Sequence, residues 1–199
     1  MTYEQQHFSL YHGQTIDFTG FFTDFKSVSN SELFNVFVQP HFLLKLEGKR
    51  GRNEKELLCK ISIDRGNPMG KRDYAIILLA CRLGLRCTDI KNLTMDNFHW
   101  EDKKLIFVQS KTRTTLSLPL TAEVGWSVID YLKYGRPNVE SRCVFVRHLA
   151  PFLPFSESDH LHQMIAKYMQ LAHLPTLRKR TGMHSLRHYV EPQIMGSST

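Results

Sequence analysis

The sequence lacks the patterns that mark secreted, membrane-spanning or metal-binding proteins. Its 199 residues include four cysteines, but none stands in CxxC spacing or beside a histidine pair, so neither a zinc site nor a disulfide framework is indicated. The longest apolar run, residues 75–81, is far shorter than the ~20 residues that cross a membrane. No basic stretch followed by an apolar one opens the chain, so a signal peptide is not expected. We therefore expect a cytoplasmic protein that holds no metal and does not enter a membrane.

What the sequence does contain is an excess of positive charge. The formal net charge is +7 and the isoelectric point is near 9.3, which favours a polyanionic partner, either nucleic acid or an anionic membrane surface. Charge alone fits an ordinary basic domain equally well. A hydrophobic content of 42% supports one core of roughly 100–150 residues with a small appendage.

The chain divides into two regions of unequal patterning. Residues 1–53 are rich in phenylalanine but show little periodicity, and only one short helix, capped by Ser31, fits there. Residues 48–52 read GKRGR, the composition of a flexible basic linker. We place a domain boundary here, with a poorly patterned N-terminal segment at 1–53 and a second domain at 54–199.

Residues 54–199 carry consistent helix signals. We expect a short helix at 54–63 ended by residues 66–68, and an all-round apolar, therefore buried, helix at 71–83 with Gly84 after its last turn. The other expected helices are one at 89–93 capped by Thr88, one from Thr121 to about Tyr134, one capped by Ser158 that continues to Ala172, and one that begins near His184 and meets Pro192.

Strand-forming residues gather in the middle of this domain. Residues 98–100, 105–109 and 115–118 are rich in β-formers, and short polar stretches separate them, which is typical of a three-stranded meander. The expected fold is mainly α with a small antiparallel β-sheet.

Four cationic residues stand at the ends of expected elements: Arg86, Lys111, His184 and Arg187. Arginines can hold the oxygens of a phosphodiester bidentately as negative charge develops. A lysine can give a proton to a leaving oxygen, and a histidine can handle another proton transfer. Taken singly, each residue also has an ordinary interpretation, as a helix-capping arginine, a turn lysine or a chance H-x-x-R match.

The order and spacing of these residues along the chain are more specific than any one of them alone. Residues 71–93, KRDYAIILLACRLGLRCTDIKNL, resemble the first conserved box of the tyrosine recombinases, R-D-x-x-I followed by G-L-R-x-x-[DE]-I-x-x-L. Residues 109–112, QSKT, are similar to the hairpin lysine of that family, and 118–120, LPL, to the strand end after it. Residues 182–188, GMHSLRH, resemble the second box, [GP]-x-H-x-L-R-H. The resemblance covers about residues 56–188.

The resemblance to this phage-integrase family implies roles for the cationic residues. Arg86 and Arg187 would bind the scissile phosphate, Lys111 would be the general acid for the 5′-hydroxyl leaving group, and His184 would assist proton transfer. Asp89 would orient its neighbours, although a first-turn helix acid fits the same position. The implied partners are double-stranded DNA and other recombinase protomers, with no metal, cofactor or small-molecule ligand.

The sequence departs from the family after Arg187. Only twelve residues follow, and none matches the expected nucleophilic tyrosine or the histidine or tryptophan before it. Tyr189 lies too close to Arg187 for that role, and residues 1–53 do not resemble the family's helical core-binding domain. We therefore expect a catalytic domain truncated before its nucleophile, of a protein for site-specific recombination and integration, inactive alone.

Two alternatives remain open. One is a non-catalytic DNA-binding pseudoenzyme that regulates recombinase sites, which steep salt-dependent duplex binding without cleavage would support. The other is a weak nuclease whose cations activate water, which ranks last because no carboxylate cluster accompanies them.

Overall fold

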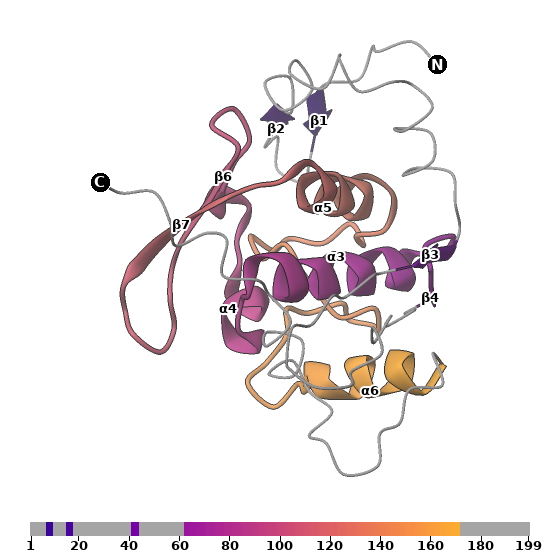
Figure 1. Ribbon diagram of the computed structural model, residues 1–199. Helices are drawn as coiled ribbons and strands as arrows, with labels where there is room; N and C mark the ends of the chain where they lie inside the picture. Colours follow the sequence, from indigo (N-terminus) through magenta and orange to yellow (C-terminus); the bar gives the residue numbers. More distant parts are fainter. Residues whose placement is uncertain (1–6, 10–14, 18–40, 44–61, 172–199) are drawn as a thin grey trace.

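The computed structural model describes residues 7–9, 15–17, 41–43 and 62–171, and helices dominate this part of the chain. Helix α3 (Pro68–Leu83) runs through the middle, between α5 (Ala122–Tyr134) on one side and α6 (Leu161–Leu171) on the other (Figure 1). A small antiparallel sheet lies beyond the C-terminal end of α3. The predicted class, mainly α with a small antiparallel sheet, is confirmed.

Helix α3 begins three residues before the predicted position. The side chain of Asn67 accepts a hydrogen bond from the backbone N–H of Gly70 at 2.7 Å, and Pro68 takes the first helical position. The prediction that residues 66–68 end an earlier helix is therefore wrong. Asparagine followed by proline starts a helix here, because asparagine caps the first free N–H groups and proline has no N–H to satisfy.

The predicted helix at 54–63 is wrong in its last two residues, which are the part of it that the structure describes. Residues 62 and 63 belong to strand β4 (Ser62–Asp64), which pairs antiparallel with β3 (His41–Leu43). A second two-stranded sheet joins β1 (His7–Ser9) to β2 (Thr15–Asp17). Ile63 is fully buried, so tertiary packing overrides the local helix pattern. The domain boundary after residue 53 stays a prediction.

Helix α3 ends as the sequence predicts. Gly84 has a φ of 66°, a left-handed conformation that residues with a Cβ rarely adopt, and its N–H bonds to the carbonyl of Leu79. The chain then turns into α4 (Cys87–Asn92), with Arg86 at the N-cap. The prediction of Thr88 as the cap is wrong, because α4 starts one residue before it.

The three-stranded meander is confirmed. Strands β5 (Phe98–His99), β6 (Lys104–Val108) and β7 (Thr115–Pro119) pair antiparallel in sequence order, after the 3-10 turn η3 (Met95–Asn97). Leu105 faces Leu118 across the β6–β7 pair, and both are buried. One face of the sheet therefore packs on the core, while the β6–β7 loop extends away from it (Figure 1).

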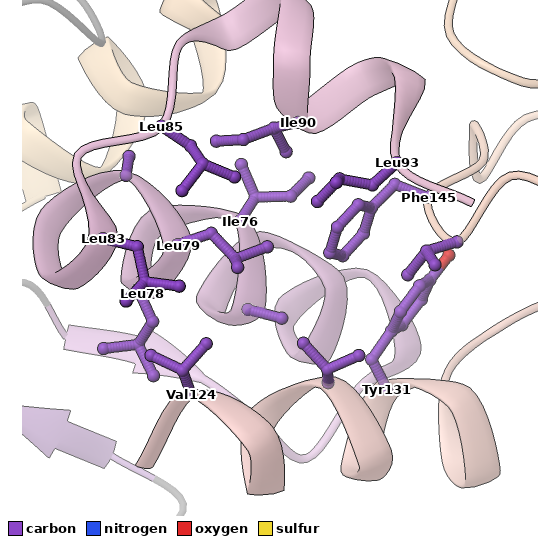
Figure 2. Close-up of a cluster of buried hydrophobic side chains, with 14 of the residues drawn as sticks. Ile76, Leu78, Leu79, Leu83, Leu85, Ile90, Leu93, Val124, Tyr131 and Phe145 are labelled. Carbon is purple, nitrogen blue, oxygen red and sulfur yellow. The ribbon is translucent and has the colours of Figure 1, made fainter. Parts of the chain in front are cut away.

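The core surrounds α3 on all sides, as its all-round apolar sequence predicts. Every residue from Ala75 to Ala80 is completely buried. Four apolar residues of α5 are also buried against it: Val124, Val128, Ile129 and Leu132. Figure 2 shows Ile90 of α4 and Leu93, the residue that follows this helix, near Ile76 and Phe145. Each large side chain fully buried in this way contributes about 1.5–3 kcal/mol.

Helix α6, unlike α3 and α4, begins later than expected. The predicted cap at Ser158 is wrong, because the helix starts at Leu161. Before it, the carboxylate of Asp159 accepts hydrogen bonds from both the N–H and the hydroxyl of Ser156, which forms a separate turn. Leu161, Ile165 and Tyr168 are buried at helical spacing.

A buried polar cluster joins α6 to α3. Arg72 donates to the carboxylate of Asp73 through Nε at 2.9 Å and Nη2 at 2.7 Å, and to the carbonyl of Val146 at 3.3 Å. The hydroxyl of Tyr168 donates to the other oxygen of Asp73 at 3.0 Å. The cluster stabilises one register of α6 because each partner would lose a buried hydrogen bond if the helix slid.

Several expectations fall outside the described residues. They are the short helix capped by Ser31, the expected continuation of the later helix to Ala172 and the helix near His184. Among the helices that the structure describes, none combines the length and apolar character that a membrane span needs.

His148 should make stability depend on pH. Burial, followed by the charge of Arg72, lowers the pKa of His148 to about 4, and its ring lies 5.9 Å from that of Tyr131. The unfolded chain takes up a proton near pH 6.5 while the folded chain does not, so this contribution is complete above pH 6.5 and is lost as pH falls toward 4. His148 is only part-buried, so solvent screens part of this effect, and between pH 7.5 and pH 5 we expect it to account for about 1 kcal/mol of lost stability.

Urea unfolding at these two pH values checks this. His148→Gln cannot take the proton and should lose less stability on acidification than the parent, whereas the matched variant of exposed His160, His160→Gln, should behave like the parent. Equal pH responses of the parent and His148→Gln would contradict the assignment.

Candidate phosphate-binding site

Arg86 is placed by the junction between two helices. It follows the left-handed turn at Gly84 and caps the N-terminus of α4 through its backbone, with extended dihedrals of −77° and 153°. Its side chain is 25% exposed. The Nη1 atom is buried, so the exposed part of the side chain lies on its other atoms. Part of this charged side chain therefore remains open to a ligand.

Asp89 lies one turn into α4 and faces Arg86. Its Oδ2 is 3.9 Å from Nη1 of Arg86, and its side chain is only 1% exposed. This distance is too long for a hydrogen bond but keeps the two charges in contact in a shielded environment. Neither atom has a hydrogen-bond partner among the described residues. The carboxylate thus holds the inner edge of the guanidinium by charge alone.

The same carboxylate also holds the β6–β7 loop. The backbone N–H of Ser110 donates to Oδ1 of Asp89 at 2.8 Å. A weaker contact joins Nδ2 of Asn92 to the hydroxyl of Ser110 at 3.4 Å. Asp89 therefore links the start of α4, where Arg86 lies, to the residue immediately before Lys111.

Lys111 lies in the turn between β6 and β7, as the sequence predicts, and is exposed. The turn is closed by two backbone hydrogen bonds between Gln109 and residues 113 and 114, both at 2.9 Å. Arg113, also exposed, has a φ of 59°. The loop presents two cations on a structured hairpin whose base is fixed by Asp89.

The structure places Arg86 at the start of α4 and Lys111 in the β6–β7 loop, and the carboxylate of Asp89 contacts both elements. His184 and Arg187 lie outside the described residues, so their position stays a prediction. Sequence reasoning missed Ser110, which contributes only a backbone N–H and therefore leaves no side-chain signal. Among residues 62–171 and the three short strands before them, no group of three or more histidine, cysteine or acidic side chains is arranged so that it could hold a metal ion.

This arrangement suits an oxyanion of high charge. A guanidinium presents donors in a planar fork that matches phosphate oxygens. A carboxylate behind it fixes its orientation in advance, and donors fixed in this way stabilise developing charge without reorganisation. A lysine on a nearby hairpin can supply a proton to a departing oxygen.

Comparisons with known proteins identify the family to which this fold belongs. The profile of the Phage integrase family matches residues 52–195. Two Sinorhizobium fredii proteins described as integrase/recombinase are similar to this chain. One, y4gC, is 36% identical over 132 residues, which is 66% of this chain and 66% of the relative. The other, y4rA, is 35% identical over 145 residues, which is 73% of this chain but 34% of the relative.

A solved structure supports the fold. The crystal structure of XerA recombinase matches with a TM-score of 0.50 at 21% identity, and the match covers 59% of this chain and 41% of that one. The aligned part thus spans about a third of y4rA and less than half of XerA.

The helical fold with its small sheet is that of a tyrosine recombinase catalytic domain. Since the family match covers well over half of its residues, the chain belongs to the phage integrase family. The family resemblance drawn from the two sequence boxes is confirmed.

Substitution of Asp89 should separate its two contacts. Asp89→Asn keeps an oxygen for the Ser110 N–H but removes the charge beside Arg86, and we expect it to lower the free energy of unfolding by about 1–2 kcal/mol. Asp89→Ala also leaves that N–H without an acceptor and should cost about 1–3 kcal/mol more.

Urea unfolding at neutral pH measures both values. The expected order of stability is parent, Asp89→Asn, Asp89→Ala. If both variants are as stable as the parent, Asp89 does not link the two elements.

Proposed function

We propose that this chain is the catalytic domain of a protein that carries out site-specific DNA recombination and integration by breaking and rejoining strands. The observation that carries the proposal is the position of Arg86. It caps α4 with its guanidinium held 3.9 Å from buried Asp89, which in turn binds the hairpin that bears Lys111. A part-exposed arginine together with a hairpin lysine suits a reaction at a phosphodiester, in which negative charge develops and an oxygen leaves.

In the proposed reaction, Arg86 holds non-bridging oxygens of the scissile phosphate through donors other than Nη1, which is buried beside Asp89. Arg187 holds the same phosphate from a second direction, in keeping with its place in the second sequence box. Together they offset the charge that the phosphorus centre gains as a fifth oxygen approaches. Each donor of this kind is worth about 2.7–4 kcal/mol of transition-state stabilisation in comparable oxyanion sites.

Lys111 and His184 supply the proton transfers in this proposal. Lys111 protonates the 5′-oxygen as the strand breaks, and its place on a loop fixed only at the base lets the long side chain follow the leaving group. His184, three residues before Arg187, assists the transfer at the attacking oxygen. None of these steps uses a metal ion or an organic cofactor.

The proposed partner is double-stranded DNA, on which further recombinase protomers would assemble. The net charge of +7 supports a polyanionic partner. The hairpin loop adds local support, because Lys111 and Arg113 are exposed within three residues of each other. Phosphate contacts by such side chains release counterions, so binding should weaken steeply with salt.

Salt-dependent DNA binding tests the role of Arg86. We expect the parent chain to bind a labelled mixed-sequence duplex, and Arg86→Ala and Lys111→Ala each to reduce the slope of log K against log salt by about 1. The matched control is Arg82→Ala, which removes one arginine from the last turn of α3, where Arg82 is paired at 2.8 Å with Glu123.

Fluorescence anisotropy over a series of salt concentrations gives these slopes. Arg82→Ala should leave the slope unchanged. Absent binding, or equal slopes for the parent and Arg86→Ala, would show that Arg86 does not contact DNA phosphate.

We further propose that these 199 residues bind and polarise the phosphate but do not by themselves attack it. No tyrosine among them matches the nucleophile of the family, and Tyr189 is only two residues from Arg187. Without a nucleophile, the cations cannot form the covalent phosphotyrosyl link that conserves the bond energy. The same observation favours a second candidate, a DNA-binding regulator of recombinase sites.

A plasmid assay tests this second proposal. Supercoiled DNA incubated with the chain should remain supercoiled, and denaturing electrophoresis should show no protein–DNA adduct. An adduct that disappears in Tyr189→Phe would contradict the proposal. Nicking without an adduct would instead indicate a nuclease, and addition of a chelator would show whether that nuclease uses a metal.

A further inference from the structure

Helix α4, whose start holds Arg86 and Asp89 of the candidate site, also contains a buried lysine. Lys91 is 6% exposed. Its ammonium donates to three backbone carbonyl oxygens in the turn before α6: Ser156 at 2.7 Å, Glu157 at 3.2 Å and Asp159 at 3.1 Å. All three donors of the ammonium group are therefore matched by acceptors from one short turn.

Burial of the Lys91 ammonium group is energetically unfavourable unless it is well compensated. Moving an ammonium group out of water costs several kcal/mol, even after relaxation, and the loss is recovered only when its partners are well placed. The hydrogen-bond partners of Lys91 among the described residues are carbonyl oxygens, which carry partial charge only. The turn that supplies them is itself closed by Asp159, whose carboxylate accepts from Ser156 at 2.6 and 2.8 Å. Lys91 therefore binds a preformed acceptor.

Asp89 and Lys91 extend from opposite faces of α4. Two residues along a helix correspond to a rotation of about 200°. Asp89 binds the β6–β7 loop through Ser110 on one face, and Lys91 binds the turn before α6 on the other. The buried side chains of Ile90 and Leu93 pack toward the core (Figure 2). Two polar contacts thus hold α4 from two sides.

Helix α4 needs such contacts because it has only six residues. A helix of that length has no stability of its own, so tertiary contacts decide its orientation. Apolar packing of Ile90 and Leu93 resists separation from the core but opposes small rotations weakly. A rotation of α4 would move Arg86 and Asp89 together, since both lie in its first turn and cap.

We propose that Lys91 is a positioning residue for Arg86. By binding the turn at 156–159, it prevents α4 from rotating away from the β6–β7 loop, and so keeps the Asp89 carboxylate where it holds both Arg86 and Ser110. The proposal rests on the proposed function of Arg86 in binding DNA phosphate. Lys91 itself does not touch the DNA.

The first test uses the free protein and needs no DNA. Lys91→Met keeps the length of the side chain and removes the ammonium. The matched control is Lys71→Met, which breaks an ion pair with Asp130 at 2.8 Å at the other end of α3. In the full chain, Lys91→Met should speed amide hydrogen exchange of Ser110 about tenfold or more relative to Lys71→Met, a typical size for coupling between contacts that share a partner. It should also shift the Nε–Hε resonance of Arg86, which Lys71→Met should leave in place.

The second test measures whether Lys91 acts through Arg86. Lys91→Met should weaken binding to the mixed-sequence duplex about fivefold to tenfold without changing the salt slope, because no phosphate contact is lost. In an Arg86→Ala background, the same substitution should change affinity less than twofold, about the limit for independent sites. Lys71→Met should leave affinity unchanged in both backgrounds.

The outcomes separate the two proposals. If the parent chain does not bind DNA in a salt-dependent way, the proposed function fails, and the Ser110 exchange and Arg86 resonance still decide the role of Lys91. If the parent binds but Lys91→Met matches Lys71→Met in exchange, resonance and affinity, the positioning role is overturned. Equal losses from Lys91→Met with and without Arg86 would also overturn it, because they would indicate general destabilisation.

Discussion

The carboxylate of Asp89 is the interaction on which the candidate site depends. It is buried, it lies 3.9 Å from the guanidinium of Arg86, and it accepts a hydrogen bond from Ser110 at 2.8 Å. A buried carboxylate needs partners, because an unpaired charge in a shielded position is strongly unfavourable. Here the partners come from the two elements that carry the candidate phosphate ligands. Folding of the helix junction and assembly of the site are therefore the same event.

The surrounding fold fixes where this carboxylate can lie. Helix α3 is buried on all sides and ends at Gly84, whose left-handed conformation turns the chain into α4. The sheet packs one face on the same core, and Ser110 at the base of its β6–β7 loop contacts α4. The turn before α6 closes the other side through Lys91. Rigid secondary structure thus holds an exposed functional edge, an arrangement typical of binding sites.

Much of this could be predicted from the sequence. The buried α3, Gly84 after it, the three strands and α5 all have strong local signals, and Arg86, Asp89 and Lys111 stand in motif positions. The errors arose where a local pattern had two interpretations. An Asn-Pro pair such as Asn67-Pro68 can either end a helix or begin one. The hydrogen bond from the N–H of Gly70 to the side chain of Asn67 shows that it begins one here. Ile63 fits a helix face as well as a strand, and its pairing with Phe42 comes from distant residues.

Two contributors to the site had no usable sequence signal. Ser110 acts through its backbone N–H, so any residue other than proline could stand there. No local pattern around Lys91 predicts its burial, and only the turn at 156–159, which begins 65 residues further along the chain, explains it. Long-range contacts of this kind cannot be inferred from periodicity or from local motifs.

A structure of the full chain bound to duplex DNA would test the central claim most directly. The account predicts a backbone phosphate within hydrogen-bond distance of the outer edge of the Arg86 guanidinium, with Asp89 still bound to Ser110 and the Lys111 loop over the same phosphate. DNA bound elsewhere on the protein, with Arg86 donating only to protein acceptors, would contradict it.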